Sequence, residues 1–358
     1  MSLELEQMSE NITNKPPEKI RDRLQMQDIA KLAGVSTSTV SRALNGSKLV
    51  NEETRLRVTA LAQSLNYSID VGAQNLRLKK NKTIAVVIPF DAANPQHVSD
   101  PFFLTMLGHI ADELTKFGYY MLVIRVSSVN LNLMLEPYES GRAEGIIVIG
   151  QCRHHELLNA MVTNKPIVVW GAKMIDQHYV SIGSNNIRGG FLATEHLIKQ
   201  NCKRIAFFGN HSLPEVSQRF AGYLLAHQQY GLVADENLSI PTPFSAETVS
   251  DDIDNLLKKS IAFDGLFACS DLIAMRALGT LQKLKISVPE KVALVGYDDI
   301  ELAAYFHPAI STIMQSIELG AQTLVKALFH IINSERAVSE ELEVNLVVRE
   351  SSSRHKPS

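Results

Sequence analysis

The sequence predicts an α/β protein in two parts: an N-terminal all-α helix-turn-helix headpiece, and a core of two open parallel-sheet subdomains. Two observations lead to this prediction. Within residues 25–44, two short amphipathic helices are separated by a tight turn. From residue 83 onward, short runs of Val and Ile alternate with longer amphipathic stretches, a pattern typical of buried parallel strands joined by helices.

Length, composition and charge fit this division. The chain has 358 residues, 45% of them hydrophobic, which suits two or three globular domains. Its net charge of -3 averages over parts of opposite sign, because residues 24–82 carry nine basic and four acidic residues, a net charge of +5. A basic module on an acidic protein is expected where nucleic-acid phosphates are bound. A solvated charged surface is the alternative.

The sequence also predicts the compartment. The N-terminus shows no basic segment followed by an apolar run, and no apolar stretch approaches the ~20 residues of a membrane span. The three cysteines are widely separated and have no metal-ligand spacing. We therefore expect a cytoplasmic protein with reduced thiols, no metal site, no cofactor and no contact with membranes.

The first helix of the headpiece places Met26, Ile29 and Ala33 on one face. Gly34 follows as a helix stop, and Ser36 is placed to cap the second helix.

In the second helix, Val40 and Leu44 give a narrow apolar edge, whereas the remaining positions are mostly small, polar or basic. Such a helix suits insertion into a major groove. An ordinary helical hairpin with a polar outer face is the alternative.

A third helix is predicted from Glu52 to about Asn66, with Asn51 as its cap. Its inward stripe is formed by Val58, Leu61, Ala62 and Leu65. The next segment, residues 70–78, is too short to form a stable helix alone. We expect it to fold only with a partner.

The core is predicted as two sets of strand–helix units, divided at about Gly183. The expected strands are 84–89, 120–126, 145–150, 167–170, 204–209, 265–269 and 292–297, and the expected helices lie around 105–117, 187–200, 215–230, 247–259 and 271–284. In open sheets of this kind, ligands bind beyond the carboxyl ends of the strands.

No catalytic motif is found: the sequence has no nucleophile elbow, no phosphate-binding Gly-Lys-Ser/Thr loop and no dinucleotide-binding glycine pattern. Asp271, Asp298 and Asp299 follow predicted strands. Because no matched nucleophile or base lies near them in the sequence, we interpret them as binding residues and expect no enzyme.

These segments together resemble the LacI/GalR family of transcriptional regulators, from Leu24 to about Arg349. The resemblance is carried by DIAKLAGVSTSTVSRALNGSKLVNEETRLRVTALAQSLNY in the headpiece, and by IGSNNIRGGFLATEHLIKQNCKRIAFFGN, QRFAGY, CSDLIAMRAL and VALVGYDDIELAAYFHPAISTI in the core. It implies a core of the periplasmic-binding-protein type. It also implies a homodimeric repressor that binds a palindromic operator in double-stranded DNA and regulates carbohydrate-utilisation genes.

For DNA contact, the resemblance matches Thr37, Ser38 and Arg42 to recognition-helix residues that read base edges. Arg42 suits a bidentate contact with guanine. The positions matched to phosphate contact or helix capping are Ser36, Thr39, Ser41 and Asn45.

Residues 70–78 match the hinge helix of the family, in which Leu76 falls on the leucine that wedges into a central base step and Ala73 lies near the minor groove. Ile69 replaces a usual proline, and Gly72 replaces a bulkier residue. Both changes should make this segment less ordered before it binds.

For the effector, Arg219 matches an arginine that binds hydroxyls or a carboxylate, and Asp298 matches an acid that pairs with sugar hydroxyls. Phe244 falls near an aromatic platform. Ser270 replaces a frequent ligand-binding asparagine, and Asp271 is either a ligand contact or a helix cap. Further candidates at the cleft mouth of the first subdomain are Asp100, Phe102 and Trp170.

One cation, several acids and several aromatic rings favour a neutral carbohydrate or sugar derivative over a purine. Effector binding would close the cleft and release DNA. The domain boundaries that follow are a flexible arm (1–23), the headpiece (24–69), the hinge helix and linker (70–82), the effector-binding and dimerisation core (83–350) and a polar tail (351–358).

Two other functions compete with this one. A stand-alone solute-binding protein is disfavoured by the missing signal peptide and by the basic headpiece. An α/β sugar enzyme is disfavoured by the missing catalytic groups. The identity of the effector, its action as inducer or corepressor, and a dimer against a larger assembly stay open.

Overall fold

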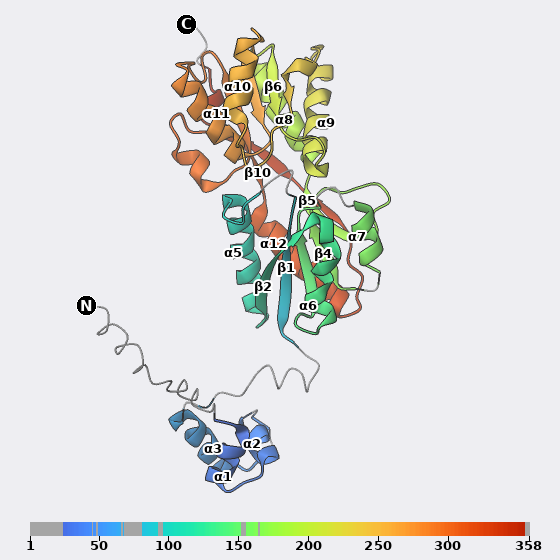
Figure 1. The fold of residues 1–358 in the computed structure, drawn as a ribbon, viewed down its shortest axis with the longest axis vertical. Helices are drawn as coiled ribbons and strands as arrows, with labels where there is room; N and C mark the ends of the chain where they lie inside the picture. Colours follow the sequence, from blue (N-terminus) through green and yellow to red (C-terminus); the bar gives the residue numbers. More distant parts are fainter. Residues whose placement is uncertain are drawn as a thin grey trace, which may run out of the picture. The chain divides into compact units, whose positions relative to one another are not determined.

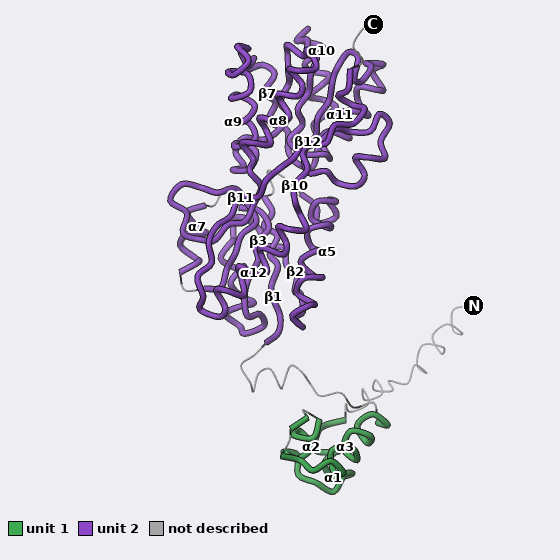
Figure 2. Tube along the Cα trace, turned by 180° about the vertical axis from the view of Figure 1, so that it is seen from behind, with its two compact units in different colours: residues 1–78 green, residues 79–358 purple. Residues whose placement is uncertain are grey.

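The computed structural model describes residues 24–44, 46–47, 49–65, 67, 81–91, 96–151, 155–163 and 165–354 (Figure 1). Contacts between residues divide the chain into two units, residues 1–78 and residues 79–358 (Figure 2). The expected flexible arm (1–23) and the expected hinge helix (70–78) lie outside the described residues.

The headpiece has three helices, which are α1 (Met26–Ala33), α2 (Thr37–Leu44) and α3 (Glu52–Ser64). α1 ends where predicted, because Gly34 adopts a left-handed conformation with φ of 64° and donates its N–H to the carbonyls of Ala30 and Lys31. α3 ends at Ser64, slightly before the predicted end.

Capping residues and a small core hold these helices together. Ser36 Oγ accepts a hydrogen bond from the Thr39 N–H at 3.2 Å, and the Asn51 side chain accepts one from the Thr54 N–H at 2.8 Å, so both predicted caps are present. The buried residues shared by the three helices and the loop before α3 are Ile29, Ala30, Ala33, Val40, Ala43, Val50 and Val58.

The first lobe of the core is built on a six-stranded sheet with strand order β11-β5-β4-β3-β1-β2. Its strands are β1 (Thr83–Phe90), β2 (Tyr120–Ser127), β3 (Gly145–Ile149), β4 (Ile167–Trp170), β5 (Val180–Ser184) and β11 (Glu340–Leu342), and its helices are α5 (Pro101–Lys116), η1 (Ser128–Leu135), α6 (Glu136–Glu139), α7 (His155–Met161) and α12 (Ile317–Ile332).

Strand β1 shows why the central strands of this lobe are apolar along their whole length. Ile84, Val86 and Ile88 pack on one face against α5 and α12, and Ala85 and Val87 pack on the other against η1 and α7. Because both faces are covered, alternation with polar residues is absent.

The second lobe is built on another six-stranded sheet, with strand order β12-β10-β9-β8-β6-β7. Its strands are β6 (Ile205–Phe208), β7 (Ser239–Ile240), β8 (Gly265–Ala268), β9 (Ala293–Asp298), β10 (Ser311–Gln315) and β12 (Val344–Val347), and its helices are α8 (Asn186–Lys199), α9 (Pro214–Gln229), η2 (Glu236–Leu238), α10 (Val249–Lys258), α11 (Asp271–Lys283), η3 (Glu301–Tyr305) and η4 (Glu350–Ser352). α8 packs with α9, and α10 packs with α11 on the opposite side of the sheet (Figure 1).

The chain passes between the lobes three times, between β5 and α8, between β10 and α12, and between β11 and β12. Hydrogen bonds join these crossings. Ser184 Oγ donates to Gln315 Oε1 at 2.6 Å, and the Asn185 N–H donates to the Leu342 carbonyl at 2.9 Å. The two lobes are therefore not simple consecutive halves of the chain, and α12 lies in the first lobe beside α5 (Figure 1).

All seven strands expected in the core are present, as are the five expected helices. The sequence prediction missed β5, β7 and β10–β12, along with α6, α7 and α12. The expected polar tail from residue 351 is wrong as far as Arg354. Ser351 and Ser352 are fully buried, and Arg354 donates to the carbonyls of Gln200 and Asp264.

Helices α8 and α9 approach so closely that their contact has no space for side chains at two glycines. A Cβ atom on Gly190 would lie 1.9 Å from the Arg219 carbonyl oxygen, and one on Gly222 would lie 2.0 Å from the Ile187 carbonyl oxygen. Since Arg219 belongs to α9, this close packing also fixes the place from which its side chain starts.

We expect Gly222→Ala to destabilise the core by about 1–3 kcal/mol or more, because the added methyl group would have to push two backbones apart. Gly279→Ala is the matched control: no atom lies within 4 Å of its Cβ position, so it should stabilise α11 by up to ~1 kcal/mol. Urea unfolding followed by circular dichroism measures both. Equal stability of the two variants would contradict the packing argument.

Candidate functional site

The outer face of α2 carries the residues expected to read DNA. Thr37, Ser38 and Arg42 are exposed, whereas Val40 and Ala43 on the same helix are buried in the headpiece core. Arg42 takes part in no ion pair among the residues that the structure describes. The helix therefore presents two hydroxyls and a guanidinium on its exposed side, and its opposite side packs into the headpiece core.

The residues expected to contact DNA phosphates differ in their exposure and in their hydrogen bonds. Ser36 Oγ is 2.8 Å from both Ser38 Oγ and Thr39 Oγ1. The hydroxyls of Ser36 and Thr39 are therefore already hydrogen-bonded at the N-terminus of α2. Ser41 is half-buried. The remaining DNA-contact candidates, Asn45, Ala73 and Leu76, lie outside the described residues.

A cavity lies between the two lobes of the core, at the carboxyl ends of strands from both sheets. The space that it encloses is about 670 Å³, a volume that includes solvent at its open mouth. Its lining residues are Pro89, Gln96, Asp100, Phe102, Phe103, Ile149, Gly150, Gln151, Trp170, Leu213, Glu215, Arg219, Phe244, Ser270, Asp298 and Gln315. Seven of the eight predicted effector residues are among them.

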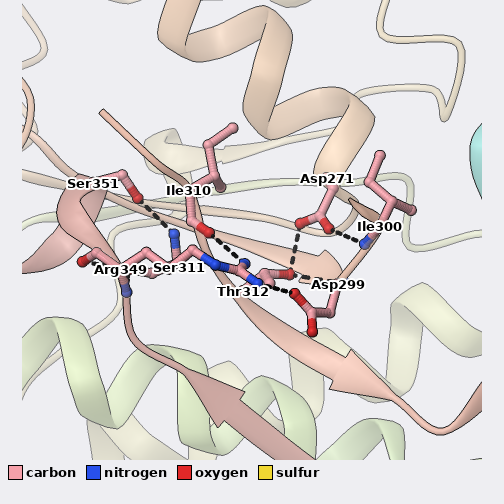
Figure 3. Close-up of polar contacts among 8 residues, drawn as sticks. All are labelled: Asp271, Asp299, Ile300, Ile310, Ser311, Thr312, Arg349 and Ser351. Carbon is pink, nitrogen blue, oxygen red and sulfur yellow. Dashed lines mark hydrogen bonds and ion pairs between the residues drawn. The ribbon is translucent and has the colours of Figure 1, made fainter. Parts of the chain in front are cut away.

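The exception is Asp271, and its prediction as an effector contact is corrected. It does not line the cavity, and each carboxylate oxygen has a partner: Oδ1 accepts from Thr312 Oγ1 at 2.6 Å, and Oδ2 accepts from the Ile300 N–H at 2.9 Å (Figure 3). It is not the helix cap either. Ser270 is that cap, and its Oγ accepts from the Ile273 N–H.

The turn that follows β9 places Asp298 in the cavity. Asp298 and Asp299 have φ angles of 119° and 57°, a left-handed conformation that non-glycine residues rarely adopt. Contacts with Arg349 hold the turn in this left-handed conformation. Arg349 Nη2 donates to Asp299 Oδ1 at 2.7 Å and Arg349 Nη1 donates to the Ile310 carbonyl (Figure 3).

Arg219 is the cation of the cavity, and it is 5% exposed. Its Nε donates to Asn186 Oδ1 at 2.9 Å, its Nη1 donates to the Cys269 carbonyl at 2.5 Å, and its guanidinium carbon lies 3.6 Å from the centre of the Tyr297 ring. These contacts, all from the second lobe, compensate part of the cost of burying the charge.

Three carboxyl groups share the cavity with Arg219. Burial is the main cause that raises the pKa of Asp298; Arg219 and a hydrogen bond from Gln315 lower it, the charge of Asp100 raises it, and the net result is a pKa of about 7. Burial also raises the pKa of Asp100 and of Glu215. Because burial favours the uncharged form of each acid, the charge of the cavity depends on pH.

Sequence reasoning missed four polar residues of this cavity, which are Gln96, Gln151, Glu215 and Gln315. Gln151 directly follows the predicted strand 145–150, and Glu215 lies one helical turn before Arg219, so both positions carried a usable signal. Gln315 carried none, because it ends β10, a strand that was not predicted. Its Nε2 donates to Asp298 Oδ1 at 2.7 Å.

Comparison with known proteins agrees with this architecture. The model of the lacI family of bacterial regulatory proteins matches residues 25–70, and that of a periplasmic binding protein-like domain matches residues 194–352. The chain is 30% identical over 308 residues to the HTH-type transcriptional repressor PurR of Actinobacillus pleuropneumoniae serotype 3 (strain JL03), which covers 84% of this chain and 88% of the relative.

The chain belongs to the lacI family of bacterial regulatory proteins. It is also 30% identical over 331 residues to the ribose operon repressor of Haemophilus influenzae (strain ATCC 51907 / DSM 11121 / KW20 / Rd), covering 91% of this chain and 98% of that one. These relatives are DNA-binding repressors and not enzymes. The family, the fold and the assignment to DNA-binding regulators predicted from the sequence are thereby confirmed.

Two solved structures share the fold of this family member. One is a transcriptional regulator CelR–cellobiose complex, with a TM-score of 0.69 and 26% identity over 92% of this chain and 100% of that chain. The other is the lac repressor dimer bound to operator and the anti-inducer ONPF, with a TM-score of 0.81 and 24% identity over 92% of this chain and 98% of that chain.

Among the described residues, no helix is long and apolar enough to cross a membrane. No group of three or more His, Cys, Asp or Glu residues within the described ranges is arranged to hold a metal ion.

We expect Asp298→Asn to flatten the pH dependence of core stability. Because the folded state raises the pKa of Asp298 to about 7, this carboxyl contributes stability that is complete below its ordinary pKa and is lost as the pH rises through 7. Urea unfolding followed by the fluorescence of Trp170, the sole tryptophan, should show wild-type stability falling by a few kcal/mol between about pH 4 and pH 8.

Asp251→Asn, at an exposed position of α10, is the control and should retain the wild-type pH dependence. If Asp298→Asn retained it as well, the assignment of this titration to Asp298 would be wrong.

Proposed function

We propose that this protein is a cytoplasmic repressor that binds a palindromic operator as a homodimer and releases it when a sugar or sugar derivative occupies the cavity between the lobes. The carrying observation is the cavity itself, which is lined from both lobes and includes Gln315 from one of the hydrogen-bonded chain crossings. A ligand that contacts both lobes changes their relative orientation, and an effector acts through such a difference between two states.

The cavity chemistry supports a carbohydrate. Asp298 and Arg219 offer an acceptor and a donor for hydroxyl groups, and Phe102, Trp170 and Phe244 offer apolar ring faces in the same cavity. Cellobiose is bound in the related CelR structure. A relative of comparable similarity is named as a ribose operon repressor.

For DNA recognition, we assign base contacts to the exposed residues Thr37, Ser38 and Arg42. The homodimer would place two copies of α2 in successive major grooves, so the operator is expected to be a palindrome. A mobility-shift titration against DNA upstream of the gene that encodes this protein tests the proposal. Absence of a specific complex at moderate salt would contradict it.

Arg42→Ala should weaken specific binding by about 1–3 kcal/mol and relax the preference at one base pair, because a bidentate base contact is lost. Arg57→Ala, which removes the same charge from an exposed position of α3, is the control. The ratio of specific to random DNA affinity measures the effect. If Arg42→Ala weakened both equally, a base-reading role would be excluded.

Asp298→Asn should leave operator affinity unchanged and remove the response to effector, since the lost carboxylate lies in the cavity and not in the headpiece. Release of operator DNA is measured in the same mobility-shift assay, with a cell extract as the source of effector. Arg219→Gln is expected to behave alike. A variant that still releases DNA does not belong to the effector site.

A further inference from the structure

A hydrogen bond joins the two lobes of the core away from the three chain crossings. Gln218 lies on α9 of the second lobe, and its Nε2 donates to the Lys173 carbonyl at 2.8 Å. Lys173 belongs to the first lobe, in the loop that follows β4. Neither residue lines the cavity, whereas Arg219, the next residue on α9, does. The contact therefore connects the lobes beside the cavity without being part of its wall.

The loop that provides the acceptor is held in place by the first lobe. Gln151 Nε2 donates to the Ala172 carbonyl at 2.6 Å, on one side of Lys173. On the other side, Gln177 Oε1 accepts from the Met174 N–H at 2.9 Å. Because both neighbours of Lys173 are hydrogen-bonded within their own lobe, the Lys173 carbonyl is presented to α9 by a fixed loop.

The donor is held in place by the second lobe. Gln218 precedes Arg219, whose buried guanidinium anchors this part of α9. Glu215 lies three residues before Gln218, on the same side of the helix. Burial raises the pKa of Glu215, and a hydrogen bond from the Gln151 backbone is one of the contacts that oppose the rise. Two side chains of α9 therefore reach the first lobe.

The hydrogen bond between Gln218 and Lys173 is a weak link. Gln218 Oε1 is buried and has no hydrogen-bond partner among the described residues. The penalty for burying this oxygen offsets part of the gain from the hydrogen bond. Separation of the lobes would expose both amide groups to water and remove the penalty. A second interaction that favours separated lobes can therefore outweigh the link.

We propose that Gln218 is a latch that holds the two lobes together without effector, and that this latch lowers the affinity of the effector-free protein for its operator. The inference rests on the proposed function, in which a ligand that brings the lobes together releases DNA. A contact that exists in only one of two states shifts the balance toward that state even when no ligand is bound. Gln218 is thus a positioning residue, which influences the response without touching the effector.

The first test measures how accessible the cavity is in the effector-free, full-length protein. Trp170 is the sole tryptophan, lines the cavity and is 5% exposed, so quenching of its fluorescence by neutral acrylamide reports separation of the lobes. At pH 8, Gln218→Glu replaces the donor by a carboxylate that repels the Lys173 carbonyl, and should raise the quenching constant at least ~2-fold. Gln218→Ala, which only removes the donor, should raise it less.

Gln228→Glu is the matched control, because it makes the same change at an exposed position of the same helix, and should quench as the wild type does. Unchanged quenching in both Gln218 variants overturns the latch. A rise in Gln218→Glu without any rise in Gln218→Ala overturns it as well, since repulsion alone would then explain the effect.

The second test measures operator affinity in the mobility-shift assay without effector. Gln218→Glu should bind the operator at least ~3-fold more tightly than Gln228→Glu, which carries the same added charge. Gln218→Ala should likewise bind more tightly than the wild type, and both Gln218 variants should need more cell extract for release. A gain of affinity separates the latch from a general loss of structure, which would weaken binding.

Operator affinity that is unchanged or weaker in the Gln218 variants, together with increased quenching, would overturn the effect of the latch on DNA binding. Failure of the proposed function would appear separately, as absence of specific operator binding by the wild-type protein. The quenching of Trp170 would in that case still decide whether Gln218 holds the lobes together.

Discussion

The hydrogen bonds that join the three chain crossings are the constraint on which the core depends. Ser184 and Gln315 connect the first crossing to the second, and Asn185 and Leu342 connect the first to the third. Gln315 also binds the cavity acid Asp298 at 2.7 Å. The cavity acid is therefore hydrogen-bonded directly to one of the chain crossings, and a two-state response to a ligand needs such a connection.

A second constraint is the buried guanidinium of Arg219. Burying a charge is costly unless hydrogen bonds and opposite charges surround it. Here Asn186, the Cys269 carbonyl and the Tyr297 ring hold it in place, and the acids around the cavity supply the opposite charge. Burial is the main cause of the raised pKa of Asp298; the charge of Asp100 adds to the rise, and Arg219 opposes it.

Central strands with continuous apolar runs, such as β1 and β3, were predictable, because both of their faces are covered and nearly every side chain is buried. Strand β10, with the sequence STIMQ, could not be predicted in this way. Its Ser311 and Thr312 are buried and hydrogen-bonded to Arg349, Ser351 and Asp271. Hydrogen bonds to distant parts of the chain therefore allow polar residues in this buried strand, and the strand lacks the apolar run by which the others were predicted. The same network explains why the end of the chain, which reads as a polar tail, is held in the second lobe.

The sequence by itself determined the headpiece, the class of the core and most of the cavity residues, since these follow from local periodicity, from caps and from a resemblance carried by contiguous motifs. Only the tertiary structure decided which acids face the cavity. Asp271 and Asp298 both lie at strand ends, yet one binds backbone and Thr312 behind the turn and the other enters the cavity. The difference arises from a left-handed turn fixed by Arg349, more than fifty residues away in the chain, and contacts over such a separation leave no local pattern.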